Sequence, residues 1–331
     1  MKRIIIIGCI VVTSLTLLVI YCYIILFRPL SATSQKKNFK IAPGSSVKSI
    51  AENLEKEGII RNKLFFWVTY KLKGEPYLKA GEYEVDLQMS LLEVFHLLEK
   101  GHIIQYKVTI PEGYNIKMIA QLLEELELTT KDSFLQQCLD VSFIKELGIE
   151  GSTVEGFLFP ETYFFAKGIG NKEMIRVMIK RFWNVFTPEM VERSKEMGYS
   201  VFEIVTMASL IEKETAIKEE MPKIAAVFYN RLKGNIRLQC DPSVIYGLPN
   251  YQGNLTKKDL KTYHPYNTYR ISGLPRGPIA NPGKDALMAA LYPANVKYKY
   301  FVSKNNGSHI FSETLRQHNR AVWKYQKRRV N

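Results

Sequence analysis

One glutamate in this sequence occupies a helix position that normally holds leucine. Residues 202–215 read Phe-Glu-Ile-Val-Thr-Met-Ala-Ser-Leu-Ile-Glu-Lys-Glu-Thr. They predict a helix whose apolar face consists of Ile204, Met207, Leu210 and Ile211. At about 100° per residue, Glu214 falls within roughly 50° of the centre of that face, whereas Glu212 lies more than about 100° away.

Burial on that face would give Glu214 the chemistry of a general acid. A partly desolvated carboxyl has a raised pKa and keeps its proton near neutral pH. That is the form that can protonate a leaving group. The alternative is a frayed helix end at which a backbone amide satisfies Glu214, which is the commoner situation for a lone glutamate on a helix.

Loops rich in amides, hydroxyls and aromatic rings follow this helix. Such side chains suit a sugar polymer, whose hydroxyls pair with amides and whose faces stack on rings. The candidate substrate-binding residues are Asn230, Gln239, Asp241, Tyr246, Asn267 and Tyr269. Ordinary turn chemistry is the alternative, and Asp241 before Pro242 fits an Asx turn slightly better than a substrate contact. His309 is either a cleft residue or a packed strand histidine.

Further helices are needed to hold the predicted acid and its loops in place. Helical spacing predicts them at 172–186, 188–197, 221–232 and 284–291, with a strand at 298–302 and a C-terminal helix from about residue 312. Beyond Leu232 the chain is rich in Gly and Pro, which is typical of loops over a cleft.

A strand-turn-helix pattern recurs earlier in the chain. It appears at residues 39–54 around Pro43-Gly44, at 108–123 around Pro111-Glu112-Gly113, and more weakly at 83–98. The spacing is irregular, so these are small α+β units and not a solenoid. Shared architecture is favoured over a chance likeness of a common unit.

An uncharged segment near the N-terminus, residues 4–27, is long enough to cross a bilayer at about 1.5 Å per residue. A signal peptide is the alternative, but its apolar stretch is only about 7–15 residues and ends in small residues. This segment instead ends in Ile24-Ile25-Leu26-Phe27. It therefore predicts an uncleaved, single-pass anchor, and Lys2 and Arg3 favour a cytoplasmic N-terminus.

The composition is that of a globular protein. Its positive charge indicates either an acidic partner or simply a basic, soluble surface. The 331 residues suit two or three domains, and the formal net charge is +14. Nucleic acid, anionic lipid and anionic wall polymer all fit that charge, as does a simple solubility trait. Cys9, Cys22, Cys138 and Cys240 form no CxxC pair, so no metal site or cofactor is predicted; a single Cys138–Cys240 disulfide stays open.

Several segments together resemble the endolytic murein transglycosylases, the YceG-like family. They are Ala208-Ser209-Leu210-Ile211-Glu212-Lys213-Glu214-Thr215, Phe228-Tyr229-Asn230-Arg231-Leu232, Leu238-Gln239-Cys240-Asp241-Pro242, Tyr266-Asn267-Thr268-Tyr269 and Gly273-Leu274-Pro275. The resemblance covers nearly the whole chain. Two departures are visible: Cys240 stands where threonine is expected, and Arg276 where a second proline is usual. We expect neither to contact the acid.

The resemblance implies an α+β protein at the cytoplasmic membrane with its catalytic part outside the cytoplasm. Its expected parts are a cytoplasmic tip (1–3), a transmembrane helix (4–27), a linker (28–37), LysM-like α+β modules (38–125), a connecting segment (126–150) and a lysozyme-related C-terminal catalytic domain (151–331). The implied partners are peptidoglycan glycan strands, with penicillin-binding proteins of the elongation machinery as further candidates.

The resemblance also implies cleavage without water, inside nascent strands, leaving 1,6-anhydro-N-acetylmuramyl ends. Glu214 would protonate the leaving glycosidic oxygen and then accept the proton of the muramyl C6 hydroxyl, which attacks C1 internally. One carboxyl then replaces the two of ordinary glycoside hydrolases.

Two rival functions compete with this one. The first is a non-catalytic, membrane-anchored peptidoglycan-binding scaffold, which would have no need of Glu214 on an apolar face. The second is a nucleic-acid binder, which would need a helix or sheet dense in Lys and Arg. The basic residues here are dispersed, so no nucleic-acid partner is predicted.

Overall fold

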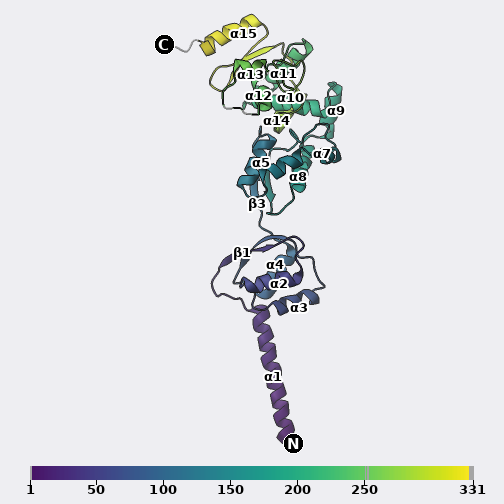
Figure 1. Ribbon diagram of the computed structural model, residues 1–331, viewed down its shortest axis with the longest axis vertical. Helices are drawn as coiled ribbons and strands as arrows, with labels where there is room; N and C mark the ends of the chain where they lie inside the picture. The colour runs from purple at the N-terminus through teal and green to yellow at the C-terminus, as the bar shows by residue number, and fades with distance from the viewer. Residues whose placement is uncertain (1, 250, 252, 328–331) are drawn as a thin grey trace. The chain divides into compact units, whose positions relative to one another are not determined.

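The computed structural model describes residues 2–249, 251 and 253–327 (Figure 1). Its chain divides into two compact units. The first contains Met1–Tyr106 and Phe164–Gly168, and the second contains Lys107–Tyr163 and Ile169–Asn331. Met1 of the predicted cytoplasmic tip and residues 250, 252 and 328–331 of the predicted catalytic domain lie outside the described residues. The mixture of helices and short strands agrees with the predicted α+β class.

The predicted N-terminal segment forms one long helix, α1 (Lys2–Phe27). Within it, Ile5–Phe27 is long and apolar enough to cross a membrane by length and composition. Most of its large apolar side chains are exposed, as a segment intended for lipid requires.

The first unit is a two-stranded sheet covered by helices. Strand β1 (Lys36–Ile41) pairs antiparallel with β2 (Gly81–Asp86). Between them lie α2 (Val47–Lys56) and α3 (Lys63–Leu72), and α4 (Leu91–Lys100) follows β2. The fully buried core includes Phe39, Leu54, Phe66, Tyr83 and Phe95. The strand-turn-helix units predicted at 39–54 and 83–98 are confirmed, and their strands are partners in one sheet.

Most of the third strand-turn-helix unit belongs to the second compact unit. It consists of β3 (Tyr106–Thr109) and α5 (Ile116–Glu125), and β3 forms a two-stranded sheet with β4 (Thr162–Phe165). The apolar face of α5 is buried where the helix packs against α6 (Lys131–Cys138). The range 38–125 predicted for the binding modules therefore contains parts of both units.

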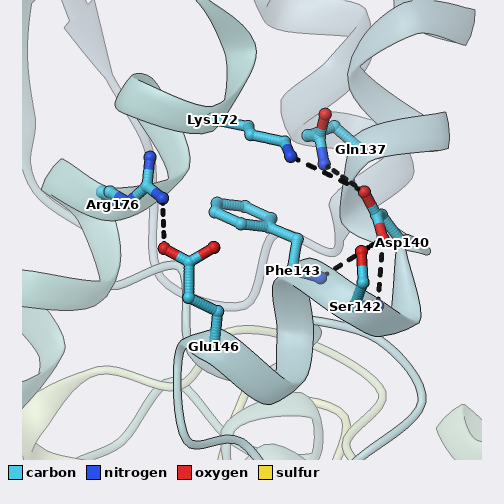
Figure 2. Close-up of polar contacts among 7 residues, drawn as sticks. All are labelled: Gln137, Asp140, Ser142, Phe143, Glu146, Lys172 and Arg176. Carbon is cyan, nitrogen blue, oxygen red and sulfur yellow. Dashed lines mark hydrogen bonds and ion pairs between the residues drawn. The ribbon is translucent and has the colours of Figure 1, made fainter.

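The segment predicted to connect the two regions, 126–150, is itself folded. It contains α6 and α7 (Val141–Glu146). Figure 2 shows how α8 (Asn171–Val185) is held against α7: Lys172 and Arg176 each lie 5.0 Å from the ring of Phe143, and Arg176 pairs with Glu146 at 2.5 Å. Asp140 caps α7 by accepting from the backbone of Phe143. Only weak periodicity marked these short helices in the sequence.

The rest of the second unit is mainly helical. Its elements are α9 (Pro188–Glu196), α10 (Val201–Glu214), α11 (Met221–Lys233), α12 (Asp241–Gly247), α13 (Lys257–Lys261), α14 (Lys284–Leu291), the hairpin β5 (Tyr300–Ser303) and β6 (His309–Ser312), α15 (Leu315–Val322) and a π-helical turn (Trp323–Lys327). Predictions for α8 to α11, α14, β5 and α15 are confirmed within a few residues; α12 and α13 are additional.

Candidate active site

The helix that ends at Glu214 is the centre of the second unit. Ser200 and Glu203 form a capping box at the start of α10, and the helix ends because Thr215 is extended. Every residue from Ile204 to Ile211 is buried, because α11, α12 and α14 all pack around this helix. The sequence predicted burial on one face only; the helix is enclosed on all sides until its last turn.

A cavity of about 480 Å³ opens at this last turn. Of the predicted site residues, Glu214, Gln239, Asp241 and Tyr269 line it. His309 lines it as well, so it is a cleft residue and a strand residue at once. Lining residues that the sequence did not single out are Arg231, Leu238, Tyr300, Phe301, Val302, Ser303, Leu315, His318, Val322 and Gln326. Arg231 was visible only as part of the Tyr-Asn-Arg-Leu segment.

The carboxyl of Glu214 is in the state that a general acid requires. Burial raises its pKa to about 7, the hydrogen bond from the thiol of Cys240 lowers it, and the charge of Asp241 raises it. A group with a pKa near the working pH can both donate and accept a proton. One carboxyl can therefore serve both proton transfers.

Cys240 contacts the acid, so the expectation that it does not is wrong. Its side chain is almost completely buried, and burial followed by the charge of Glu214 raises the pKa of the thiol well above its ordinary value. The thiol therefore stays protonated and donates to Glu214. Cys240 and Cys138 are both free, so the disulfide left open by the sequence is not formed.

A second carboxyl, Asp241, lines the same cavity. It is the first residue of α12 and accepts a hydrogen bond of 2.6 Å from the hydroxyl of Tyr269. The Asx turn considered from the sequence has no counterpart among the hydrogen bonds of the described residues. Asp241 and Tyr269 instead form a polar wall beside Glu214.

Three predicted binding residues do not line the cavity, and two of them, Asn230 and Asn267, hold loops instead. Asn230 donates to the carbonyls of Val296 and Tyr298. Asn267 is fully buried and donates to three carbonyls of the preceding turn, at Asp259, Leu260 and Thr262. Amide side chains serve turns as readily as substrates, which is why sequence could not separate these two roles.

Tyr246 points into a separate buried network. Its hydroxyl donates to Glu155 at 3.0 Å. Glu155 also accepts the N–H of Ile116, at 3.1 Å to each oxygen, and the amide of Asn281 at 3.1 Å. Burial raises the pKa of Glu155 to about 7, although these donors act in the opposite direction. This network joins the start of α5 to the loop before α14.

His309 is fixed by a carboxylate behind it. Glu220 accepts from the backbone N–H of His309 at 3.0 Å and pairs with Nδ1 at 2.7 Å. Burial raises the pKa of Glu220, but these two bonds outweigh it and hold the pKa below its usual value. The ring therefore has one orientation in the cavity. Within the described ranges, no cluster of three or more His, Cys, Asp and Glu side chains could hold a metal ion.

A partly buried carboxyl with a pKa raised to about 7 lines this cavity together with amide and aromatic side chains, and such a carboxyl can both donate and accept a proton. The YceG-like family profile matches residues 39–324. The chain is 36% identical over 304 residues to an endolytic murein transglycosylase of Bacillus subtilis, covering 87% of this chain and 84% of that one. This chain belongs to the YceG-like family.

Other relatives agree with that assignment. An endolytic murein transglycosylase of Streptococcus pneumoniae is 30% identical, covering 92% of this chain and 61% of that longer protein. The crystal structure of a putative YceG-like protein from Listeria monocytogenes is similar with a TM-score of 0.59 and 33% identity, covering 87% of this chain and 100% of that one. The resemblance found in the sequence is confirmed, and the predicted enzyme class is the one that the curated relatives' names state.

Proposed function

We propose that this protein is a membrane-anchored lytic transglycosylase that cleaves peptidoglycan strands internally. The observation that carries the proposal is Glu214: a partly buried carboxyl with a pKa raised to about 7 that lines the cavity. The names of its relatives supply the substrate class, since murein is peptidoglycan. The bond cut is the one between N-acetylmuramic acid and N-acetylglucosamine, which terminates elongation of the nascent strand.

The geometry supports a mechanism with one catalytic carboxyl. Protonated Glu214 gives its proton to the glycosidic oxygen as the C1–O bond breaks, and the carboxylate then takes the proton of the C6 hydroxyl as that oxygen bonds to C1. Atoms balance without water, and the intramolecular attack gains the advantage of proximity. Gln239, Asp241 and Tyr269 are the proposed substrate contacts, because they line the same cavity.

We propose that the first unit and α1 hold the catalytic part of the protein at the membrane and near glycan. We propose that α1 is an uncleaved anchor with its N-terminus in the cytoplasm. The first unit acts as a LysM-like module for glycan, and penicillin-binding proteins remain candidate partners. The mature protein should keep Lys2 and fractionate with membranes; a mature N-terminus near Ser31 would contradict the anchor.

The decisive experiment is mass analysis of the fragments released from purified sacculi. Wild-type protein should leave anhydro ends, which weigh one water less than reducing ends. Reducing ends would instead indicate a hydrolase that uses Glu214 with a second carboxyl. Binding to sacculi without release of fragments would favour the scaffold alternative.

A further inference from the structure

Arg231 is a buried cation that lines the cavity of Glu214. Its side chain is 8% exposed, and burial lowers its pKa. Arginine nevertheless stays charged in proteins. Within the described part of the chain, it bonds only to neutral oxygens: Nη1 to the carbonyl of Leu238 at 3.2 Å and Nη2 to Oε1 of Gln239 at 2.5 Å. Burying a cation without a carboxylate partner is costly, which points to a task in the cavity.

The bond between Arg231 and Gln239 decides which end of the Gln239 amide faces the cavity. A guanidinium has donors only, so the group it meets must be the amide oxygen and not the NH₂. The guanidinium is itself held in place by the ring of Tyr300, 5.5 Å away. The exposed end of the Gln239 side chain is therefore Nε2, which carries two donors and no acceptor.

The backbone of Gln239 is fixed as firmly as its side chain. Its φ of 54° lies in the left-handed region, which a residue with a side chain adopts only when the surroundings hold it. The N–H of Gln239 donates to the carbonyl of Thr268 at 3.2 Å. The amide is thus presented to the cavity in one orientation, and the charge of Arg231 polarises it into a stronger donor.

We propose that Arg231 and Gln239 together recognise the carbonyl oxygen of a sugar 2-acetamido group, so that the site selects N-acetylated glycan. This inference rests on the proposed function. A sugar hydroxyl can donate or accept, and a donor-only group does not favour it over other partners. The acetamido carbonyl only accepts, and each N-acetylated sugar carries one. Gln239 is the specificity-determining contact, and Arg231 is the residue that positions it.

The test compares two substrates that differ only in this group: sacculi, and the same sacculi treated with a peptidoglycan deacetylase. For the wild type, kcat/KM on acetylated glycan should exceed that on deacetylated glycan about tenfold or more. Gln239→Ala should bring this ratio close to one. Gln239→Glu should invert it, because a carboxylate that still pairs with Arg231 would repel the carbonyl and attract the ammonium group of the deacetylated sugar.

Using a ratio removes effects that act equally on both substrates, such as a changed charge beside Glu214. Gln136→Glu, the same change at an exposed position on α6, is the matched control and should keep the wild-type ratio. Arg231→Lys keeps the charge but cannot hold Leu238 and Gln239 together, so it should lower the ratio without inverting it. Thermal unfolding of each variant shows whether it is folded.

Two outcomes would overturn the inference. One is equal wild-type activity on both glycans; the other is an unchanged ratio in folded Gln239→Ala and Gln239→Glu, whatever their absolute rates. In both outcomes, the wild type still forms anhydro ends from acetylated sacculi, so the proposed function would stand. Failure of the proposed function looks different, because the wild type would then form no anhydro ends at all.

Discussion

Two glutamates in the second unit, Glu155 and Glu214, both have a pKa raised to about 7, but their surroundings differ. Glu155 is surrounded by donors on both oxygens, from Ile116, Tyr246 and Asn281. Glu214 has the thiol of Cys240 and an open side that lines the cavity. A raised pKa alone therefore does not mark a catalytic acid. Glu214, the proposed acid, differs from Glu155 because its carboxyl lines a cavity in which a substrate oxygen could reach it.

The largest expected effect is on catalysis at Glu214. Glu214→Gln keeps the shape and removes the titrating proton, and the loss of a general acid/base that serves both transfers should reach about 10⁴-fold in kcat. The measurement is the rate of anhydro-end formation from sacculi. Binding to sacculi should survive, since Gln still forms hydrogen bonds.

The neighbouring glutamate is the control for this variant. Glu212 accepts the N–H of Gly283 at 3.0 Å, away from the cavity lining. Glu212→Gln should therefore be much milder. If Glu212→Gln abolished activity while Glu214→Gln did not, the catalytic assignment would be wrong.

Glu214→Gln is expected to lower activity but not to lower the free energy of unfolding. Burial raises the pKa of Glu214 in the folded state to about 7 from its ordinary value of 4.5, so the folded state binds the proton more tightly than the unfolded chain. Stability from this group is full at low pH and is lost as pH rises from about 4.5 through 7. Glu214→Gln cannot ionise, so at pH 8 it should be at least as stable as the wild type in urea unfolding. A clearly less stable variant at pH 8 would give Glu214 a structural role.

The second-largest effect is on stability at Glu155. The N–H of Ile116 can only donate and meets both oxygens of Glu155, so Glu155→Gln would turn an NH₂ group toward a donor whichever way the amide lies. An unsatisfied buried polar group costs about 1–3 kcal/mol in the free energy of unfolding. Urea unfolding at pH 7 measures this, with exposed Glu150→Gln as the control. Folded Glu155→Gln should retain most of its activity; a 10⁴-fold loss would erase the distinction between the two carboxyls.

The sequence predicted Glu214 but could not predict the contrast with Glu155. Helical spacing selected Glu214 because the apolar face of α10 extends into its last turn. The long helices around α10 also have strong apolar periodicity. Glu155 lies in an irregular segment, and its partners are up to 126 residues distant in the chain. Such partners have no local signature. The same limit explains why Asn267 and Tyr246 were grouped with Gln239, since residue type alone does not tell which way an amide or hydroxyl points.

Replacing Cys240 should have a smaller effect, on the pH dependence of the rate, because Cys240 contacts Glu214 and not Glu155. Its thiol bond lowers the pKa of Glu214, so Cys240→Ala should raise that pKa and move the alkaline limb of the rate profile to higher pH. Cys240→Thr, which offers a stronger hydroxyl donor, should move it to lower pH. The equally buried Cys138→Ala in α6 is the control. Identical limbs in all three variants would show that Cys240 does not tune the acid.

The smallest effect is expected at Asp241, whose charge acts on Glu214 and which transfers no proton in the proposed mechanism. Because this charge raises the pKa of Glu214, Asp241→Asn should lower that pKa and move the alkaline limb to lower pH. This shift is in the opposite direction to that of Cys240→Ala. Asn can still accept from Tyr269, so the wall of the cavity should keep its shape, and kcat at the optimum should change only a few-fold.

Exposed Asp132→Asn is the control. A loss comparable to that of Glu214→Gln would contradict the one-carboxyl mechanism, because it would make Asp241 the second catalytic group of a hydrolase. The end groups distinguish the two cases: with one carboxyl, the residual product of Asp241→Asn is still anhydro-terminated.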